Sequence, residues 1–155
     1  MRLERKVARG LTVRNKTLAV AESCSGGLLS HRITNVPGSS KFFKLALITY
    51  HDQAKIKLLK IPPAVLKRYG AVSQPVARRM AESVRRILRT DLGIGITGIA
   101  GPSGGTPEKP VGLTFIAISS TTKTVVRKFR FRGGRPAIKS QAATQALRML
   151  CTFLT

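Results

Sequence analysis

The sequence predicts an α/β fold, a three-layer α/β/α sandwich built around a mixed β-sheet. Short apolar runs typical of buried strands alternate with segments of helical periodicity. The last two strand-like segments are separated only by a polar turn, which favours an antiparallel pair in a sheet that is otherwise parallel. The chain has 155 residues and is 43% hydrophobic, enough for one sizeable core. Since we find no repeat and no linker, we expect residues 1–155 to form a single domain.

The first half of the chain predicts three helices and two strands. Residues 3–15 have apolar side chains at helical spacing, and residues 17–22 form a near-continuous apolar strand. Two glycines then open a helix over residues 28–36, which a Pro-Gly pair ends. An apolar strand follows at residues 45–50. Residues 51–60 indicate a helix that ends before two prolines and a turn.

The second half predicts an amphipathic helix, three strands and a closing helix. Residues 73–89 begin with a serine suited to cap a helix and separate an apolar face from a row of arginines. Residues 92–100 form an apolar strand dotted with glycines. We expect residues 113–119 and 124–132 to form a hairpin. Residues 136–154 have proline in the first turn and a long apolar face, which predicts the closing helix.

The chain is unusually basic. It has 28 Lys and Arg against 6 Asp and Glu, a formal net charge of +22. Such a charge attracts phosphate groups of any kind, although a solvated basic surface explains it equally well. No apolar run approaches a membrane span, the N-terminus lacks the features of a signal peptide, and the two cysteines form no disulfide framework. We therefore expect a cytoplasmic protein with free thiols.

The turn after the first strand is the first candidate site. Ser23 and Ser25 lie between an apolar strand and the pair Gly26-Gly27, which opens a helix. This arrangement can present a nucleophilic hydroxyl and point backbone N–H groups at negative charge. It can equally be a capped strand-to-helix turn, because serine is a common N-cap. The residues of this turn leave both interpretations open.

A serine nucleophile requires a base, and the chain offers few. His31 and His51 are the only histidines, and neither is well placed by the sequence for a Ser-His-Asp triad. Tyr50 and Lys55 follow the second apolar strand and could face the same crevice. A lysine acts as a base only where its pKa is lowered. Among so many lysines, physical reasoning alone does not select Lys55.

The glycine-rich segment of residues 93–112 is the second candidate site. It contains the letters of a dinucleotide-binding fingerprint, but the prolines and glycines that follow forbid the helix that this fingerprint requires. A long loop rich in backbone N–H donors is more typical of a substrate wall or a phosphate cradle. No group of His, Cys, Asp and Glu has metal-ligand spacing, so we expect neither a metal nor a cofactor.

Basic and aromatic residues also interleave at residues 127–135. Strand alternation explains the pattern, with Phe129 and Phe131 packed inward and the basic residues facing solvent. Aromatic residues make up only 5% of the chain, so platforms for base stacking are scarce. The segment does not by itself indicate nucleic-acid binding.

Four motifs, in order and in register, resemble one known family. They are "AESCSGG", "TYHDQAK", "GAVSQPVARRMAESVR" and "GITGIAGPSGGTPEKPVG". Together they resemble the C-terminal domain of the competence/damage-inducible protein CinA, and the resemblance covers nearly the whole chain. It implies a three-layer α/β/α domain that hydrolyses the carboxamide of nicotinamide mononucleotide to nicotinic acid mononucleotide and ammonia, without metal or cofactor.

The resemblance also implies roles for individual residues. Ser23 is then the nucleophile, and Tyr50 and Lys55 complete the catalytic group, with the Ser23 proton passing to Lys55 directly or through Tyr50. The expected substrate-binding residues fall into three groups. Ser25, Gly26 and Gly27 shape the turn and its oxyanion hole, and Gly98, Gly101 and Gly105 belong to the glycine loop. Lys139 stands where the family has an arginine early in the last helix. Asp52 stands where relatives commonly have asparagine, and as an acidic neighbour it would raise the pKa of Lys55.

Two functional hypotheses therefore remain. The first is an amidase whose partner is a small nucleotide, working as a homo-oligomer and meeting nucleic acid only through weak, charge-driven contacts. The second is a non-catalytic nucleotide- or nucleic-acid-binding module on the same fold. Release of ammonia from nicotinamide mononucleotide distinguishes them.

Overall fold

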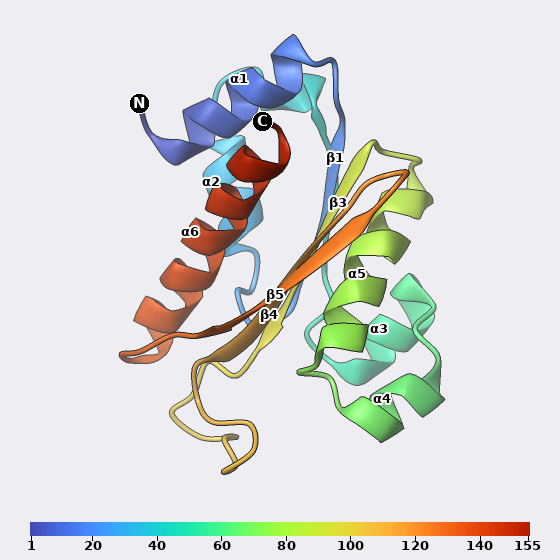
Figure 1. Cartoon of the computed structure of the whole chain (residues 1–155), viewed down its shortest axis with the longest axis vertical. Helices are drawn as coiled ribbons and strands as arrows, with labels where there is room; N and C mark the ends of the chain where they lie inside the picture. The colour runs from blue at the N-terminus through green and yellow to red at the C-terminus, as the bar shows by residue number, and fades with distance from the viewer.

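The computed structural model describes residues 1–155 and contains five strands and six α-helices (Figure 1). In chain order the elements are α1 (Leu3–Val13), β1 (Leu18–Glu22), α2 (Leu28–Thr34), the 3₁₀ turn η1 (Ser39–Lys41), β2 (Phe43–Ile48), α3 (Asp52–Leu59), α4 (Pro63–Tyr69), α5 (Gln74–Ile87), β3 (Leu92–Gly98), β4 (Leu113–Ser119), β5 (Thr124–Arg130) and α6 (Arg135–Phe153).

The strands form one mixed sheet in the order β2-β1-β3-β4-β5. β1 pairs in parallel with both β2 and β3, whereas β4 runs antiparallel to β3 and to β5. The predicted mixed sheet and C-terminal hairpin are therefore confirmed. Because β1 and β3 are adjacent and parallel, the segments that follow them leave the sheet at the same edge.

Helices cover both faces of the sheet, as Figure 1 shows. α1, α2 and α6 lie on one face, where 24 buried residues form the larger core cluster. α3, α4 and α5 lie on the other face over a smaller cluster of eight buried residues. The expected three layers are present. All five residues of β1 are buried between them, so the turn after β1 starts from a rigid position.

Two glycines of β3 allow α5 to pack closely on the sheet. A Cβ atom at Gly93 or Gly95 would collide with the backbone carbonyl oxygens of Ala81 and Ala77 on α5. The glycine letters that resemble a dinucleotide fingerprint therefore serve helix packing at these two positions. Ser73 caps α5 as expected, its hydroxyl accepting the N–H of Val76 at 3.4 Å.

Two local expectations need correction. The second strand spans Phe43–Ile48 and alternates between half-buried and exposed residues, because β2 is an edge strand and not a buried one. Tyr50 therefore lies two residues beyond its end. In addition, the residues between the Pro62-Pro63 pair and the expected turn at Gly70 form a helix that was not predicted: Pro63 starts α4, since proline suits the first position of a helix.

Candidate functional site

Ser23 lies at the edge of the sheet where β1 and β3 end. Its N–H donates to the carbonyl of Ile96 at 3.0 Å, which keeps the start of the turn attached to β3. The side chain is buried but lines a cavity of about 200 Å³. The cavity is bounded by Ser23, Cys24, Tyr50, Asp52, Lys55, Ala71, Val72, Thr97, Gly98 and Ala100.

The carboxylate of Glu22 organises this turn. Glu22 is fully buried and accepts hydrogen bonds from the hydroxyls of Ser25 and Ser30, both at 2.6 Å. It also accepts the N–H groups of Gly27 and Leu29 at 3.2 Å and of Ser30 at 2.8 Å. These bonds satisfy the backbone donors at the start of α2, and they place an acid where its charge complements the helix dipole.

These bonds correct one expectation about the oxyanion hole. The N–H of Gly27 donates to Glu22, and the N–H of Gly26 donates to the carbonyl of Ser23 at 3.0 Å. Neither glycine amide is free to bind a reacting oxygen. The amides of Cys24 and Ser25, by contrast, donate to no oxygen and lie near the Cys24 thiol.

Lys55 contacts Ser23 directly. Its side chain is 1% exposed, and its Nζ lies 3.1 Å from the Ser23 Oγ. Nζ also donates to the carbonyl of Thr49 at 2.8 Å and to that of Tyr50 at 3.4 Å. The lysine is positioned because α3 begins at Asp52, so that Lys55 faces the sheet one turn into the helix.

Burial lowers the pKa of Lys55, because the charged ammonium is removed from water. The Asp52 carboxylate, with an oxygen 4.0 Å from Nζ, opposes this shift. Burial also raises the pKa of Cys24 to about 11, which favours the thiol over the more nucleophilic thiolate at neutral pH.

Tyr50 lines the cavity with a half-exposed ring but makes no hydrogen bond to Ser23. Its hydroxyl accepts a hydrogen bond from Arg135 Nη2 at 2.5 Å, and the Nη1 of the same guanidinium donates to the carbonyl of Gly101 at 2.6 Å. No hydrogen bond joins the Tyr50 hydroxyl to Lys55. Of the two expected proton routes, the structure contains the direct contact from Ser23 to Lys55.

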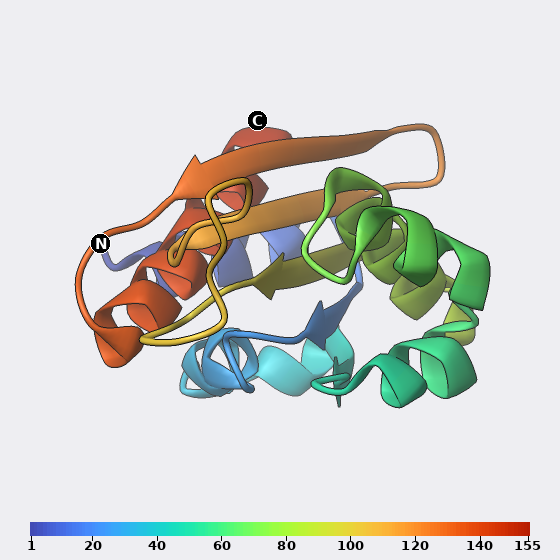
Figure 2. The same cartoon turned by 90° about the horizontal axis from the view of Figure 1, so that it is seen from below.

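The loop of residues 99–112 projects beyond the edge of the sheet at which the site lies (Figures 1 and 2). Arg135 donates to the carbonyl of Gly101 at the start of the loop, and Lys109 near its end donates to the carbonyl of Tyr69 on α4. Gly98 and Ala100 form part of the cavity wall. Gly105 packs against the backbone of Val111 and lines neither this cavity nor the one described next.

A second cavity, of about 410 Å³, adjoins the turn on the side of α6. His31, Arg135 and Lys139 are its titratable residues, and no acidic residue lines it. Lys139 extends to Gly26, where an added Cβ would lie 3.3 Å from its Nζ. The predicted residues Ser25, Gly26, Gly27 and Lys139 are thus brought together here, although the Ser25 hydroxyl is committed to Glu22.

Neither histidine supports Ser23. His51 caps α3, its Nδ1 accepting the N–H of Gln53 at 3.1 Å, and His31 pairs with Asn35. No three side chains of His, Cys, Asp and Glu gather as metal ligands, and the structure contains no helix with the length and apolar character of a membrane span.

Sequence reasoning missed Glu22 and Arg135 as parts of the site. A glutamate at the end of a buried strand, with serines three and eight residues later, is a signal that could have identified Glu22. Arg135 had no such signal, because its two partners lie 34 and 85 residues away in the chain.

Comparison with known proteins gives one consistent result. A family model described as the CinA C-terminal domain matches residues 1–154. A CinA-like protein of Syntrophus aciditrophicus is 50% identical over 153 residues, which are 98% of this chain and 36% of that protein. A CinA-like protein of Syntrophotalea carbinolica is 46% identical over 148 residues, 96% of this chain and 36% of that protein. The chain thus spans just over a third of the length of these relatives.

Solved structures agree over the full fold. The competence/damage inducible protein CihA from Agrobacterium tumefaciens matches with a TM-score of 0.96 at 33% identity, covering 99% of this chain and 94% of that one. A CinA superfamily protein from Klebsiella pneumoniae matches with a TM-score of 0.95 at 30% identity, covering 98% and 95%.

Proposed function

The chain belongs to the CinA C-terminal domain family, and from this premise we propose that it is an amidase acting on nicotinamide mononucleotide. The products are nicotinic acid mononucleotide and ammonia. The observation that carries the proposal is the 3.1 Å contact between Lys55 Nζ and Ser23 Oγ, two side chains that line the same small cavity. A nucleophile beside a buried base is the minimal machinery for acyl transfer.

Lys55 serves as the general base in its neutral form. A neutral amine has two N–H groups and one lone pair. The carbonyls of Thr49 and Tyr50 accept the two N–H groups, which leaves the lone pair directed at the hydroxyl of Ser23. Burial favours this neutral form, so the lysine removes the Ser23 proton as Oγ attacks the carboxamide carbon.

The tetrahedral intermediate carries negative charge on the former carbonyl oxygen. The amides of Cys24 and Ser25 are its donors in this proposal, since they follow the nucleophile directly and no oxygen in the protein accepts from them. Glu22 fixes the turn that holds these amides through its bonds to Ser25 and Ser30. Such donors stabilise a transition state because their orientation is set before reaction.

The remaining steps reuse Lys55. The Lys55 ammonium returns its proton to the amide nitrogen, the C–N bond breaks, and ammonia leaves an ester between the substrate acyl group and Ser23. Lys55, neutral again, takes a proton from water, and the resulting attack on the ester releases the carboxylic acid and restores the Ser23 hydroxyl.

The substrate spans the two cavities. The smaller cavity holds the carboxamide ring beside Ser23, and the larger one takes the 5′-phosphate among His31, Arg135 and Lys139. Cations without an acidic neighbour favour a phosphate. Arg135 lies at the boundary, since it lines the larger cavity and binds the Tyr50 hydroxyl at the mouth of the smaller one.

The test is release of ammonia from nicotinamide mononucleotide by the purified protein. Ser23→Ala is expected to lower kcat by at least about 1,000-fold. The matched control is Ser83→Ala, which removes a hydroxyl on α5 that lines neither cavity and is expected to leave kcat unchanged. Mass spectrometry of the acid-quenched wild-type reaction is expected to detect the acyl ester on the peptide that contains Ser23. Absence of ammonia release by the wild type, or full activity of Ser23→Ala, refutes the proposal.

A further inference from the structure

We propose that the outer face of α5, together with the adjoining part of β5, binds the phosphate backbone of duplex DNA. We call this surface the α5 face; its basic residues are Arg78, Arg79, Arg85, Arg86, Arg89, Lys128 and Arg130. It lies outside the candidate amidase site and needs no residue of that site. The proposal therefore stands or fails independently of the proposed function.

The arginines of α5 form two rows along the helix. Arg78 and Arg85 are seven residues apart, and so are Arg79 and Arg86. Seven residues are nearly two helical turns, about 10.5 Å along the axis, so the two members of each pair lie on one side of the helix. Arg79 and Arg86 are exposed, whereas Arg78 and Arg85 are half-buried at the flank of the face. Arg89 extends the surface beyond the helix end. The opposite side of α5 packs on the sheet, which holds these rows in place.

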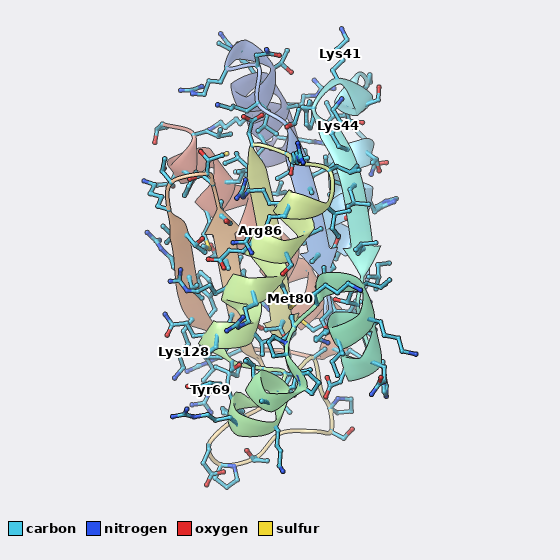
Figure 3. All side chains as sticks on the ribbon, turned by 90° about the vertical axis from the view of Figure 1, so that its right-hand side faces the viewer. Lys41, Lys44, Tyr69, Met80, Arg86 and Lys128 are labelled. Carbon is cyan, nitrogen blue, oxygen red and sulfur yellow. The ribbon has the colours of Figure 1, made fainter.

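β5 extends the basic surface next to the helix. Val126 packs with Ala77 and Ala81 of α5, and the Thr124 hydroxyl donates to Glu82 at 2.9 Å. Side chains two residues apart in a strand share one face of the sheet. Lys128 and Arg130 therefore face the same side as α5, and both are exposed. Figure 3 shows Arg86 and Lys128 on this side of the molecule.

The charge of this face is not neutralised. Glu82 is its single acidic residue, and it pairs with Arg78 at 3.6 Å. Elsewhere Glu4 pairs with Arg32, Asp91 pairs with Lys16, and Glu22 is buried. Most of the few acids are thus committed away from the α5 face, which leaves six of its seven basic residues without an ion-pair partner.

The chemistry of the face favours a duplex over other polyanions. Binding of single strands relies on exposed aromatic rings, and the nearest exposed ring, Tyr69, is already stacked under Arg68 at 5.1 Å. The major groove of B-DNA admits an α-helix with phosphates on both sides of it, whereas the deep, narrow major groove of A-form RNA excludes one. Arginine also suits phosphate, because its planar fork donates two hydrogen bonds at once.

The experiment compares two variants that lose the same charge from opposite layers. Arg79→Gln/Arg86→Gln removes one arginine from each row of the α5 face. Arg5→Gln/Arg9→Gln removes two exposed arginines from α1, on the other side of the sheet. Thermal unfolding checks that both variants are folded, and ammonia release checks that the amidase site is unaffected.

Binding of a labelled 20-base-pair duplex is measured by fluorescence anisotropy between 50 and 300 mM salt. We expect the α5 variant to bind about tenfold or more weakly at 150 mM salt and its salt slope to fall by about 2, because about one phosphate contact is lost per arginine. The α1 variant is expected to change the affinity less than about twofold.

Three results overturn the proposal. The first is an equal loss in both variants, which would mean that only the overall charge attracts DNA. The second is a single strand of the same length that binds as tightly as the duplex. The third is binding to phosphatidylserine vesicles that depends on Arg79 and Arg86 while the duplex is not bound at 150 mM salt.

Discussion

Asp52→Asn tests whether Lys55 is the base, since it removes a charge near the lysine and preserves the shape of the side chain. The Asp52 carboxylate lies 4.0 Å from Lys55 Nζ and favours the protonated lysine. Two unit charges at this distance interact by about 1 kcal/mol in water, the appropriate limit because Asp52 is 55% exposed. That energy corresponds to about a fivefold change in the protonation equilibrium, and screening at physiological salt reduces it to about threefold.

The expected result is a pH profile of kcat/KM displaced to lower pH. The rate rises with pH as Lys55 loses its proton, so the variant is about three- to fivefold faster than the wild type on the acidic limb and equal to it on the plateau. The profile is obtained from initial rates of ammonia release. Glu108→Gln is the control, because it removes the same charge from an exposed carboxylate that has no ion-pair partner. An unchanged profile, or one displaced to higher pH, refutes the assignment of Lys55 as the base.

Three other substitutions probe the same region. Lys55→Met is expected to abolish activity. Burial lowers the pKa of Lys55 below the unfolded-state value of 10.5, so the wild type gains stability as pH rises and the advantage of the variant over it is greatest near pH 7 and declines toward about pH 10. Urea unfolding at both pH values measures this, and a stability difference that does not depend on pH contradicts it. Glu22→Gln lowers the free energy of unfolding by about 3 kcal/mol in urea titrations, because an amide cannot accept all five hydrogen bonds; a loss below about 1 kcal/mol contradicts the role of this acid. Arg135→Gln lowers kcat/KM about 10- to 100-fold by releasing Tyr50 and Gly101, with little change in the unfolding temperature; kinetics equal to the wild type contradict this role.

The layers and strands of the fold could be predicted from sequence because their patterns are local. The apolar run of β1 and the amphipathic pattern of α5 each follow from a few neighbouring residues. β2 was harder, since its burial depends on its place at the sheet edge, and sequence periodicity does not report strand order. The start of α4 was missed because a proline pair ends one helix and, at its second residue, begins another.

Ser23, Tyr50 and Lys55 could be named before the structure was known because each lies in a short motif. The way in which they meet could not. Lys55 reaches Ser23 across 32 residues, and Arg135 reaches Tyr50 across 85. The sequence also did not show which N–H groups of the turn are free to bind an oxyanion. That depends on which of them donate to Glu22, and the structure shows that those of Gly27, Leu29 and Ser30 do. The roles of these residues in catalysis stay predictions.

The close packing of α5 on Gly93 and Gly95 has a consequence for substrate selection. Ala71 and Val72, which lead into α5, line the cavity beside Ser23, and Thr97 of β3 donates to the carbonyl of Ala71 at 2.8 Å. Because a methyl group at either glycine would clash with α5, we expect it to push the helix away from the sheet and to move this wall. The two glycines therefore help to set the width of the cavity beside Ser23 from the opposite side of α5. Under the proposed function, we expect a substitution at Gly93 or Gly95 to change which amides are accepted, although neither glycine lines the cavity.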